Sequence, residues 1–258
     1  MSKNKILSLL LIIMVLSFAL NDILSANLVP ECSIHKVDKY SKIPNFINYK
    51  TPAKRIQYFY TFLTPIVNNE NSKILCDRRK LTRIMAQTES KKLRENDINW
   101  LKQKAAYYKL RSFSYNNEQD LKKLKGRIDI IPVEIVLSQA AIESAYGTSG
   151  FARRANNLFG MRTYSKTNGL IPQNIPQNSG IYVAKYESVN QSVQSYCRNL
   201  NTHKAYANFR KKRSELRAGN SPLDPFQLVT NLIAYSEEGP RYINKITRVM
   251  EKNVNLLN

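Results

Sequence analysis

The sequence predicts a mainly helical protein with a small β element. After residue 50, apolar residues recur at three- and four-residue spacing through most of the chain, as amphipathic helices require. Residues 161–185 break this pattern, because they are rich in Asn, Gly, Ser, Pro and Gln and hold only two short apolar runs, at 170–171 and 181–183. We expect a small, irregular β-hairpin or flap there. At 258 residues and 43% hydrophobic, the chain is large enough for a buried core.

Residues 1–26 have the pattern of an export signal. Lys3 and Lys5 precede an apolar run over residues 6–20, followed by a cleavage position after Ala26. If the leader stays uncut, the run is short of the roughly 20 residues of a spanning helix but could still serve as an inner-membrane anchor. In either case we expect the protein to be exported, to the periplasm or cell envelope.

Charge narrows the range of partners. The chain carries 40 basic and 19 acidic residues, a net charge of +21, which attracts polyanions and acidic surfaces. Peptidoglycan carboxylates, anionic lipid headgroups and nucleic acid all fit, and a lysine-rich solvated surface without a partner is the alternative. The basic helical faces lack interleaved aromatic platforms, and no zinc-finger or RNA-binding signature is present. Together with the export signal, this leads us to expect no nucleic-acid partner, but contact with an anionic membrane or wall surface.

Cysteine and histidine are too scarce for a metal or thiol centre. An oxidising compartment would permit one disulfide among Cys32, Cys76 and Cys197 and leave one thiol, and the spacing does not identify the pair. Cys197 lies on an apolar helical stripe, so we expect a buried free thiol there. His35 and His203 are the only histidines. We therefore expect no metal and no cofactor.

Residues 27–113 are expected to form a tether and a helical extension without an acid–base constellation. The polar stretch 27–49 lacks periodicity and is interpreted as the tether. Pro65 should kink or end the first helix. The periodicity predicts helices that start near Thr51, with Pro52 in the first turn, at 74–85, and at 98–108 with Asn96 as N-cap.

Residues 114–258 are expected to form the catalytic domain. A short helix closed by Gly126 comes first, then a central helix and the flap. Ser188 and Gln191 form a capping box for the next helix. Asp224 followed by Pro225, and later Pro240, mark the starts of two more.

Glu143 has an unusual environment in the central helix. Pro132 suits the first helical position, since its missing N–H would be unpaired there, and Gly147 offers a left-handed stop after Tyr146. Glu143 then lies in the last turn, on one stripe with Gln139 and among small and apolar neighbours. The helix dipole and partial burial both disfavour the ionised carboxylate, so we expect a raised pKa. A glycosidase needs such a proton donor; an ordinary surface glutamate is the alternative.

Several ordered blocks of sequence resemble one enzyme family. The central block is QAAIESAYGTS followed by FARRANNLFG, and the others are FLTPIVNNENSKIL, RIDIIP, YESVNQSVQSYCRNLNTH and YSEEGPRYINKI. They resemble the FlgJ-type N-acetylglucosaminidases of bacterial cell walls, and more narrowly the Bax-like proteins of that group. The resemblance covers nearly everything after the first 50 or so residues, and it implies a lysozyme-like helical domain.

The resemblance also implies an activity and a set of site residues. The activity is hydrolysis of the β-1,4 bond on the reducing side of N-acetylglucosamine in peptidoglycan glycan strands, with Glu143 as general acid. Tyr235 or Tyr242 would orient or polarise the acetamido group, and packing in the core is the alternative for both. The side chains expected to bind the sugar are Tyr146, Asn156, Asn157, Phe159, Tyr182 and Tyr242. For the two asparagines and Phe159, a tight turn with capped backbone groups is the alternative.

The chain departs from the family at the second carboxylate. Residues 161–185 contain no Asp or Glu, and Tyr182 stands where Bax-like chains tend to have an acid. The substrate's acetamido oxygen could act instead, or Glu187, our primary candidate, or Glu238 could supply a base. Two other functions stay open. One is a muramidase or lytic transglycosylase, for which one glutamate suffices; the other is a peptidoglycan-binding scaffold without turnover.

Overall fold

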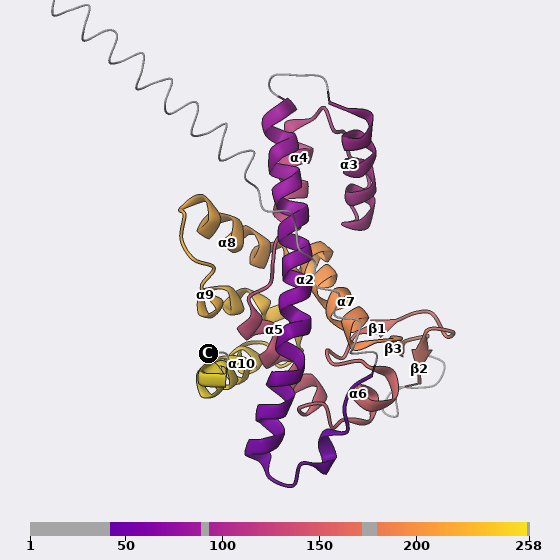
Figure 1. The fold of residues 1–258 in the computed structure, drawn as a ribbon, viewed down its shortest axis with the longest axis vertical. Coiled ribbons are helices and arrows are strands. Elements are labelled where there is room, and N and C mark those ends of the chain that lie inside the picture. Colours follow the sequence, from indigo (N-terminus) through magenta and orange to yellow (C-terminus); the bar gives the residue numbers. More distant parts are fainter. Residues whose placement is uncertain (1–41, 89–92, 172–179, 257–258) are drawn as a thin grey trace, which may run out of the picture. The chain divides into compact units, whose positions relative to one another are not determined.

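The computed structural model describes residues 42–88, 93–171 and 180–256. The chain divides into two compact units, Met1–Ile34 and His35–Asn258. The expected export signal falls in the first unit, outside the described residues. The second unit is mainly helical with a small antiparallel sheet, as predicted (Figure 1). No helix in the described part of the chain is both long and apolar enough to span a membrane.

The elements follow one another in this order. The helices of the first half are η1 (Phe46–Asn48), α2 (Pro52–Thr88), α3 (Glu95–Tyr107), α4 (Glu118–Arg127), α5 (Val133–Ser144) and α6 (Gly150–Ala155). The strands are β1 (Arg162–Thr163), β2 (Gly169–Leu170) and β3 (Tyr182–Ala184). The remaining helices are α7 (Val189–Thr202), η2 (Lys204–Tyr206), α8 (Ala207–Ala218), α9 (Pro225–Val229), η3 (Thr230–Tyr235), α10 (Pro240–Asn253) and η4 (Val254–Leu256).

Helix α2 is the long central element in Figure 1. It runs for 37 residues with Pro65 inside it, so of the two expected outcomes at that proline, a kink or an end, the end is wrong. An interior proline costs about 3 kcal/mol. Burial offsets this cost, because α2 packs against α4, α5 and α7 along its length. The side chains that it buries are Phe59, Tyr60, Leu63, Ile66, Val67, Ile74, Leu81 and Ile84.

Helix α5 lies at the centre of the packing. Most of its residues are buried, since α2 and α10 both pack against it, and a helix that is apolar nearly all round belongs in a core. Its C-terminal end differs slightly from the prediction: Ala145 and Tyr146 already have left-handed backbone, before Gly147 at φ +77°. The aromatic ring of Phe46 packs where a Cβ on residue 147 would lie. Residues 42–49, expected to be part of a tether, are thus packed against the end of α5.

The flap is a three-stranded antiparallel sheet rather than a simple hairpin. The strand order is β1–β3–β2, with Arg162 opposite Val183 and Gly169 opposite Ala184. β2 and β3 fall at the two apolar runs of the sequence, as predicted, whereas β1 at Arg162–Thr163 lies outside both runs and was not predicted. Residues 172–179 lie outside the described part.

A buried ion cluster fixes the segment that leads into α5. Asp129 is 2% exposed and pairs with Arg78, Arg213 and Arg217 at 3.4, 3.8 and 3.0 Å. Arg213 is fully buried and also donates to the backbone oxygens of Gly126, Asp129 and Ile130. The cluster therefore joins α2, α8 and the residues before α5, and so fixes where α5 begins.

Several local predictions can be compared with the structure. Confirmed are the Ser188 and Asp224 N-caps, the start of α10 at Pro240, and a buried free thiol at Cys197. Cys76 is disulfide-bonded; Cys32 lies outside the described residues. Asn96 is not an N-cap, because α3 begins at Glu95. Pro132 and Gly126 are each one position off, since α5 begins at Val133 and α4 continues to Arg127.

Candidate active site

The carboxyl group of Glu143 is half-buried in the last turn of α5. Its hydrogen-bond donor is a neutral phenol rather than an arginine: the Tyr242 hydroxyl donates to Oε1 at 2.6 Å. The other oxygen, Oε2, faces the exposed backbone of Gly160, where an added Cβ would lie 3.3 Å away. One oxygen is therefore held from the protein side, and the other faces a surface position that has no side chain.

A directed chain of hydrogen bonds ends on Glu143. The Tyr196 hydroxyl donates to Gln139 Oε1 at 2.5 Å, and Gln139 Nε2 donates to the Tyr242 oxygen at 3.0 Å. Tyr242 in turn donates to Glu143. Tyr196 and Gln139 are fully buried, so this polar chain crosses the core between α7, α5 and α10. Chains of this kind hold each member in one orientation.

The environment of Glu143 raises its pKa above the ordinary carboxyl value, mainly through burial. The Tyr242 hydrogen bond and the charge of Lys245 oppose the shift, whereas the charge of Glu238 reinforces it. Burial thus dominates over two interactions that favour the ionised form. The expected raised pKa agrees with this environment.

Aromatic rings form the wall behind the carboxyl group. Tyr235 and Tyr242 are stacked at 5.6 Å with an interplanar angle of 4°, and Phe159 stacks on Tyr196 at 4.1 Å. The Tyr235 hydroxyl donates to the backbone oxygen of Phe159 at 2.9 Å. Tyr235 therefore ties the turn after α6 to the C-terminal part of the chain, while Tyr242 contacts the acid directly.

The two asparagines of the NNLFG segment shape the turn that brings Gly160 to Glu143. Asn157 is 2% exposed; its amide nitrogen donates to the oxygens of Met161 and Ala184, and its oxygen accepts from the N–H groups of Phe159 and Met161. Asn156 has left-handed backbone and donates to the Tyr186 oxygen at 3.0 Å. These contacts are structural. Direct sugar contact by either asparagine, or by the buried Phe159, stays a prediction.

Tyr146 and Tyr182 lie on two other elements. Tyr146 follows α5, and its ring packs edge-on against Phe59 of α2 at 5.8 Å. Tyr182 pairs with Thr163 in the sheet and lines a hollow of about 450 Å³ together with Arg154 and other residues of the flap. Their roles in binding a sugar also stay predictions.

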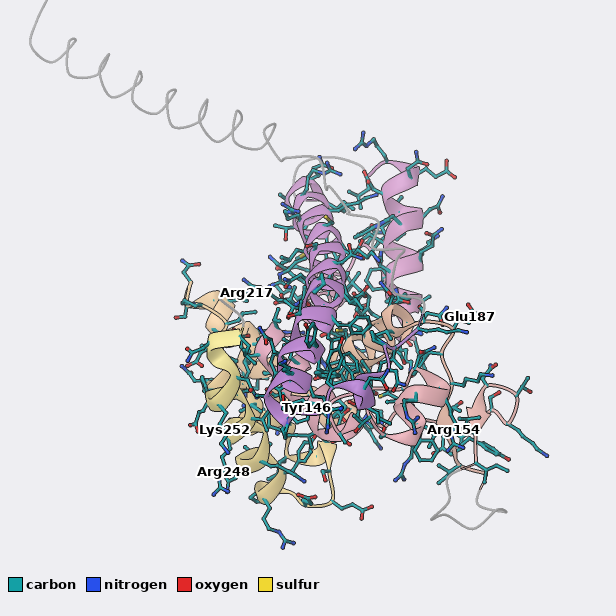
Figure 2. All side chains as sticks on the ribbon, turned by 60° about the horizontal axis from the view of Figure 1, so that its bottom comes forward. Tyr146, Arg154, Glu187, Arg217, Arg248 and Lys252 are labelled. Carbon is teal, nitrogen blue, oxygen red and sulfur yellow. The ribbon has the colours of Figure 1, made fainter. Side chains whose placement is uncertain are left out.

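The two candidate second carboxylates differ in their surroundings. Glu187 is exposed just before α7 (Figure 2), and its carboxylate accepts from Gln191 at 3.1 Å. Glu238 is exposed near the start of α10 and pairs with Lys245 at 3.6 Å. Glu238 and Lys245 are the charges that act on Glu143. Of the two candidates, Glu238 is the one whose charge contributes to the raised pKa of Glu143.

Sequence reasoning missed the interior of this site. Gln139 is placed on the stripe of Glu143 by its spacing, but nothing in that spacing shows that it joins Tyr196 to Tyr242. The signal that was available is chemical: Gln139 stands between buried Ser138 and Ala140 on a mostly buried helix, and a buried amide requires partners. In the described residues, no group of three or more Cys, His, Asp or Glu side chains could hold a metal ion.

Comparison with known proteins identifies the family. Residues 118–255, more than half of the chain, match the glucosaminidase family, described as mannosyl-glycoprotein endo-beta-N-acetylglucosaminidase. The chain belongs to the glucosaminidase family. It is a Bax-like member, since it is 31% identical over 222 residues to Protein bax of Escherichia coli (strain K12), covering 85% of this chain and 77% of that protein. Both matches confirm the resemblance seen in the motif blocks, and membership in the glucosaminidase family places the chain among glycoside hydrolases acting on glycans. No solved structure gave a significant match.

Proposed function

We propose that this glucosaminidase-family protein is an exported hydrolase of bacterial cell-wall peptidoglycan. It cleaves the β-1,4 bond on the reducing side of N-acetylglucosamine, with Glu143 as the general acid. The observation that carries this proposal is the arrangement of the Glu143 carboxyl group, which is half-buried, hydrogen-bonded on one oxygen and open toward Gly160 on the other.

The two oxygens of Glu143 take different roles in the proposed mechanism. Because Tyr242 donates its only hydroxyl proton to Oε1, the acidic proton of Glu143 belongs on Oε2. Burial favours this neutral form. A glycosidic oxygen placed above Gly160 would receive the proton from Oε2 as the bond to the sugar breaks. The developing carboxylate is then stabilised by Tyr242 and, at longer range, by Lys245.

To complete the hydrolysis, water adds to the sugar carbon as the bond to the leaving oxygen breaks, and a second group accepts the proton that this water loses. We propose that Glu238 takes this role in place of Glu187, because Glu238 acts electrostatically on Glu143, whereas Glu187 is hydrogen-bonded to Gln191. Attack by the substrate's own acetamido oxygen is the route that needs no second carboxylate. Substitution of Glu238 separates the two routes, because only the first would lose turnover.

Export is part of the proposal. Its support is the pattern of residues 1–26 and the disulfide bond at Cys76, because disulfides persist in oxidising compartments outside the cytosol.

The test is a paired assay of wild type and Glu143→Gln on purified peptidoglycan. We expect cleared zones in a gel for wild type alone, and turnover at least about 100-fold lower for the variant, the usual range for loss of a general acid. Mass spectrometry of the wild-type products should find N-acetylglucosamine at the new reducing ends. N-acetylmuramic acid or an anhydro sugar there would instead identify a muramidase or a lytic transglycosylase, and no clearing by either protein would favour a binding scaffold.

A further inference from the structure

One face of α10 carries four basic side chains in a row. We call Arg241, Lys245, Arg248 and Lys252 the α10 basic row. At 3.6 residues per turn, the four fall within a stripe about 60° wide and about 16 Å long. Together with Asn244 and Val249, they line an open hollow of about 330 Å³. The row is thus one continuous surface on one side of the helix.

The charges of this surface are largely unpaired. All four side chains are exposed, and within the described residues their one ion pair joins Lys245 to Glu238. Like charges at three- and four-residue spacing repel one another, and Arg241 in the first turn opposes the helix dipole. The packing of α10 is provided by its other face. Lys252 in the last turn favours the helix dipole, but the repulsion along the row remains, and an external anion would relieve it.

The row begins at the candidate active site and leads away from it. Arg241 directly precedes Tyr242, the partner of Glu143, in the sequence. The charge of Lys245 lowers the pKa of Glu143. Arg248 and Lys252 follow at increasing distance along the helix, and Figure 2 shows both extending outward from it. An anion carried by the polymer that is cleaved at Glu143 would reach this surface without a second binding event.

We propose that the α10 basic row binds the free carboxylates of the peptide stems that hang from the glycan substrate. This inference rests on the proposed function, and it adds a preference for strands that still carry their stems. The stem carboxylates belong to the substrate itself and lie away from the sugar rings, whereas stripped glycan keeps only the lactyl carboxylate of each N-acetylmuramic acid, close to the ring.

Charge and apolar surface together favour peptide stems over a lipid surface. A helix that lies on a membrane inserts an apolar face, but Tyr242, Ile246 and Met250 of α10 are buried in the core and its other apolar residues, Ile243 and Val249, are half-buried. None of the exposed large apolar side chains of the described chain belongs to α10. The row therefore offers mainly charge, with Val249 as the one apolar residue that lines its hollow.

The test measures binding of soluble glycan strands by calorimetry in the full-length Glu143→Gln protein, in which cleavage is suppressed. The strands are prepared with stems intact or with stems removed by an amidase, which leaves only the lactyl carboxylate on each N-acetylmuramic acid. Replacing both Arg248 and Lys252 with Gln should raise the Kd for stem-bearing strands about threefold to tenfold, the effect of losing two exposed ion pairs. The Kd for stripped strands should not change.

A matched variant controls for net charge. Replacing Lys54 and Lys211, exposed lysines on α2 and α8, with Gln removes the same charge and should leave both Kd values unchanged. Binding does not depend on turnover, so a failure of the proposed activity would leave this result interpretable. An equal weakening for both kinds of strand, or no weakening, would overturn the inference. The inference would also be overturned if the Arg248 and Lys252 double variant lost binding to vesicles of equal parts phosphatidylglycerol and phosphatidylcholine but kept its binding to stem-bearing strands.

Discussion

The Tyr242 hydroxyl lies 2.6 Å from Oε1 of Glu143 and is itself held by Gln139. These residues come from α10 and α5, about 100 positions apart in the chain. The acid thus has a fixed partner whose position depends on the packing of α10 against α5.

Tyr242→Phe should shift the pH dependence of the reaction. The hydrogen bond lowers the pKa of Glu143, so its removal raises that pKa further and moves the alkaline limb of the kcat/KM profile to higher pH. Turnover should fall about tenfold or more, because a hydrogen bond to a charged group is lost. Tyr235→Phe, which removes the contact to Phe159 but leaves Glu143 bonded, is the control and should not move the alkaline limb. A shift of this limb to lower pH in Tyr242→Phe would contradict the assignment.

Glu238→Gln should act in two ways. The charge of Glu238 raises the pKa of Glu143, so the alkaline limb should move to lower pH. If Glu238 is the second carboxylate, turnover at the optimum should also fall about 100-fold. The matched variant Glu187→Gln should change neither quantity. If turnover fell more in Glu187→Gln than in Glu238→Gln, Glu187 would again be the favoured second carboxylate, as expected from the sequence.

Gly160→Ala should reduce activity beyond its effect on stability. A Cβ at this position would lie 3.3 Å from Glu143 Oε2, and the backbone has φ +63°. The left-handed backbone alone costs about 1–2 kcal/mol with a side chain. Gly180 has φ +66° with nothing within 4 Å, so Gly180→Ala should show similar strain in urea denaturation. We expect at least about a tenfold loss of turnover only in Gly160→Ala, and equal activities in the two variants would refute the crowding of Oε2.

Glu143→Gln should stabilise the protein at neutral pH. The folded state raises the pKa of Glu143, so the folded protein binds this proton more tightly than the unfolded chain does. The stability contributed by the protonated group is complete below the unfolded pKa of about 4.3 and is lost as pH rises through the folded value. A glutamine at position 143 is uncharged at every pH, so the variant does not lose this stability as the pH rises. The Tm of Glu143→Gln should therefore exceed that of wild type at pH 7, and the difference should shrink toward pH 4. A difference in Tm that does not depend on pH would argue against a raised pKa of Glu143.

Asp129→Asn should destabilise the fold severely. It leaves the fully buried guanidinium of Arg213 without its carboxylate, and breaking a buried ion pair costs about 3–5 kcal/mol. The free energy of unfolding from urea titration measures this loss. Glu118→Gln, which breaks the exposed pair with Lys122, should cost no more than about 0.5 kcal/mol. Comparable losses in the two variants would show that Asp129 does not join the helices as described.

Local signals predicted the helical class, the positions of β2 and β3 in the flap and the helix starts at Ser188, Asp224 and Pro240, because caps, prolines and apolar periodicity act over a few residues. Pro65 misled the prediction, since burial on both sides of it comes from helices distant in sequence. Likewise, spacing placed Glu143 in the last helical turn. It could not reveal the chain from Tyr196 through Gln139, which exists only once α5, α7 and α10 are packed together.

The length of α2 determines where a truncated fragment of this protein can begin. The family match starts at residue 118, yet α5 packs against α2, which begins at Pro52, upstream of that match. A shortened protein that began at residue 118 would lack α2. The apolar surface of α5 would then be exposed to solvent, and the helix that carries Glu143 would lose this packing. Any fragment made to assay the proposed activity should therefore begin before Pro52.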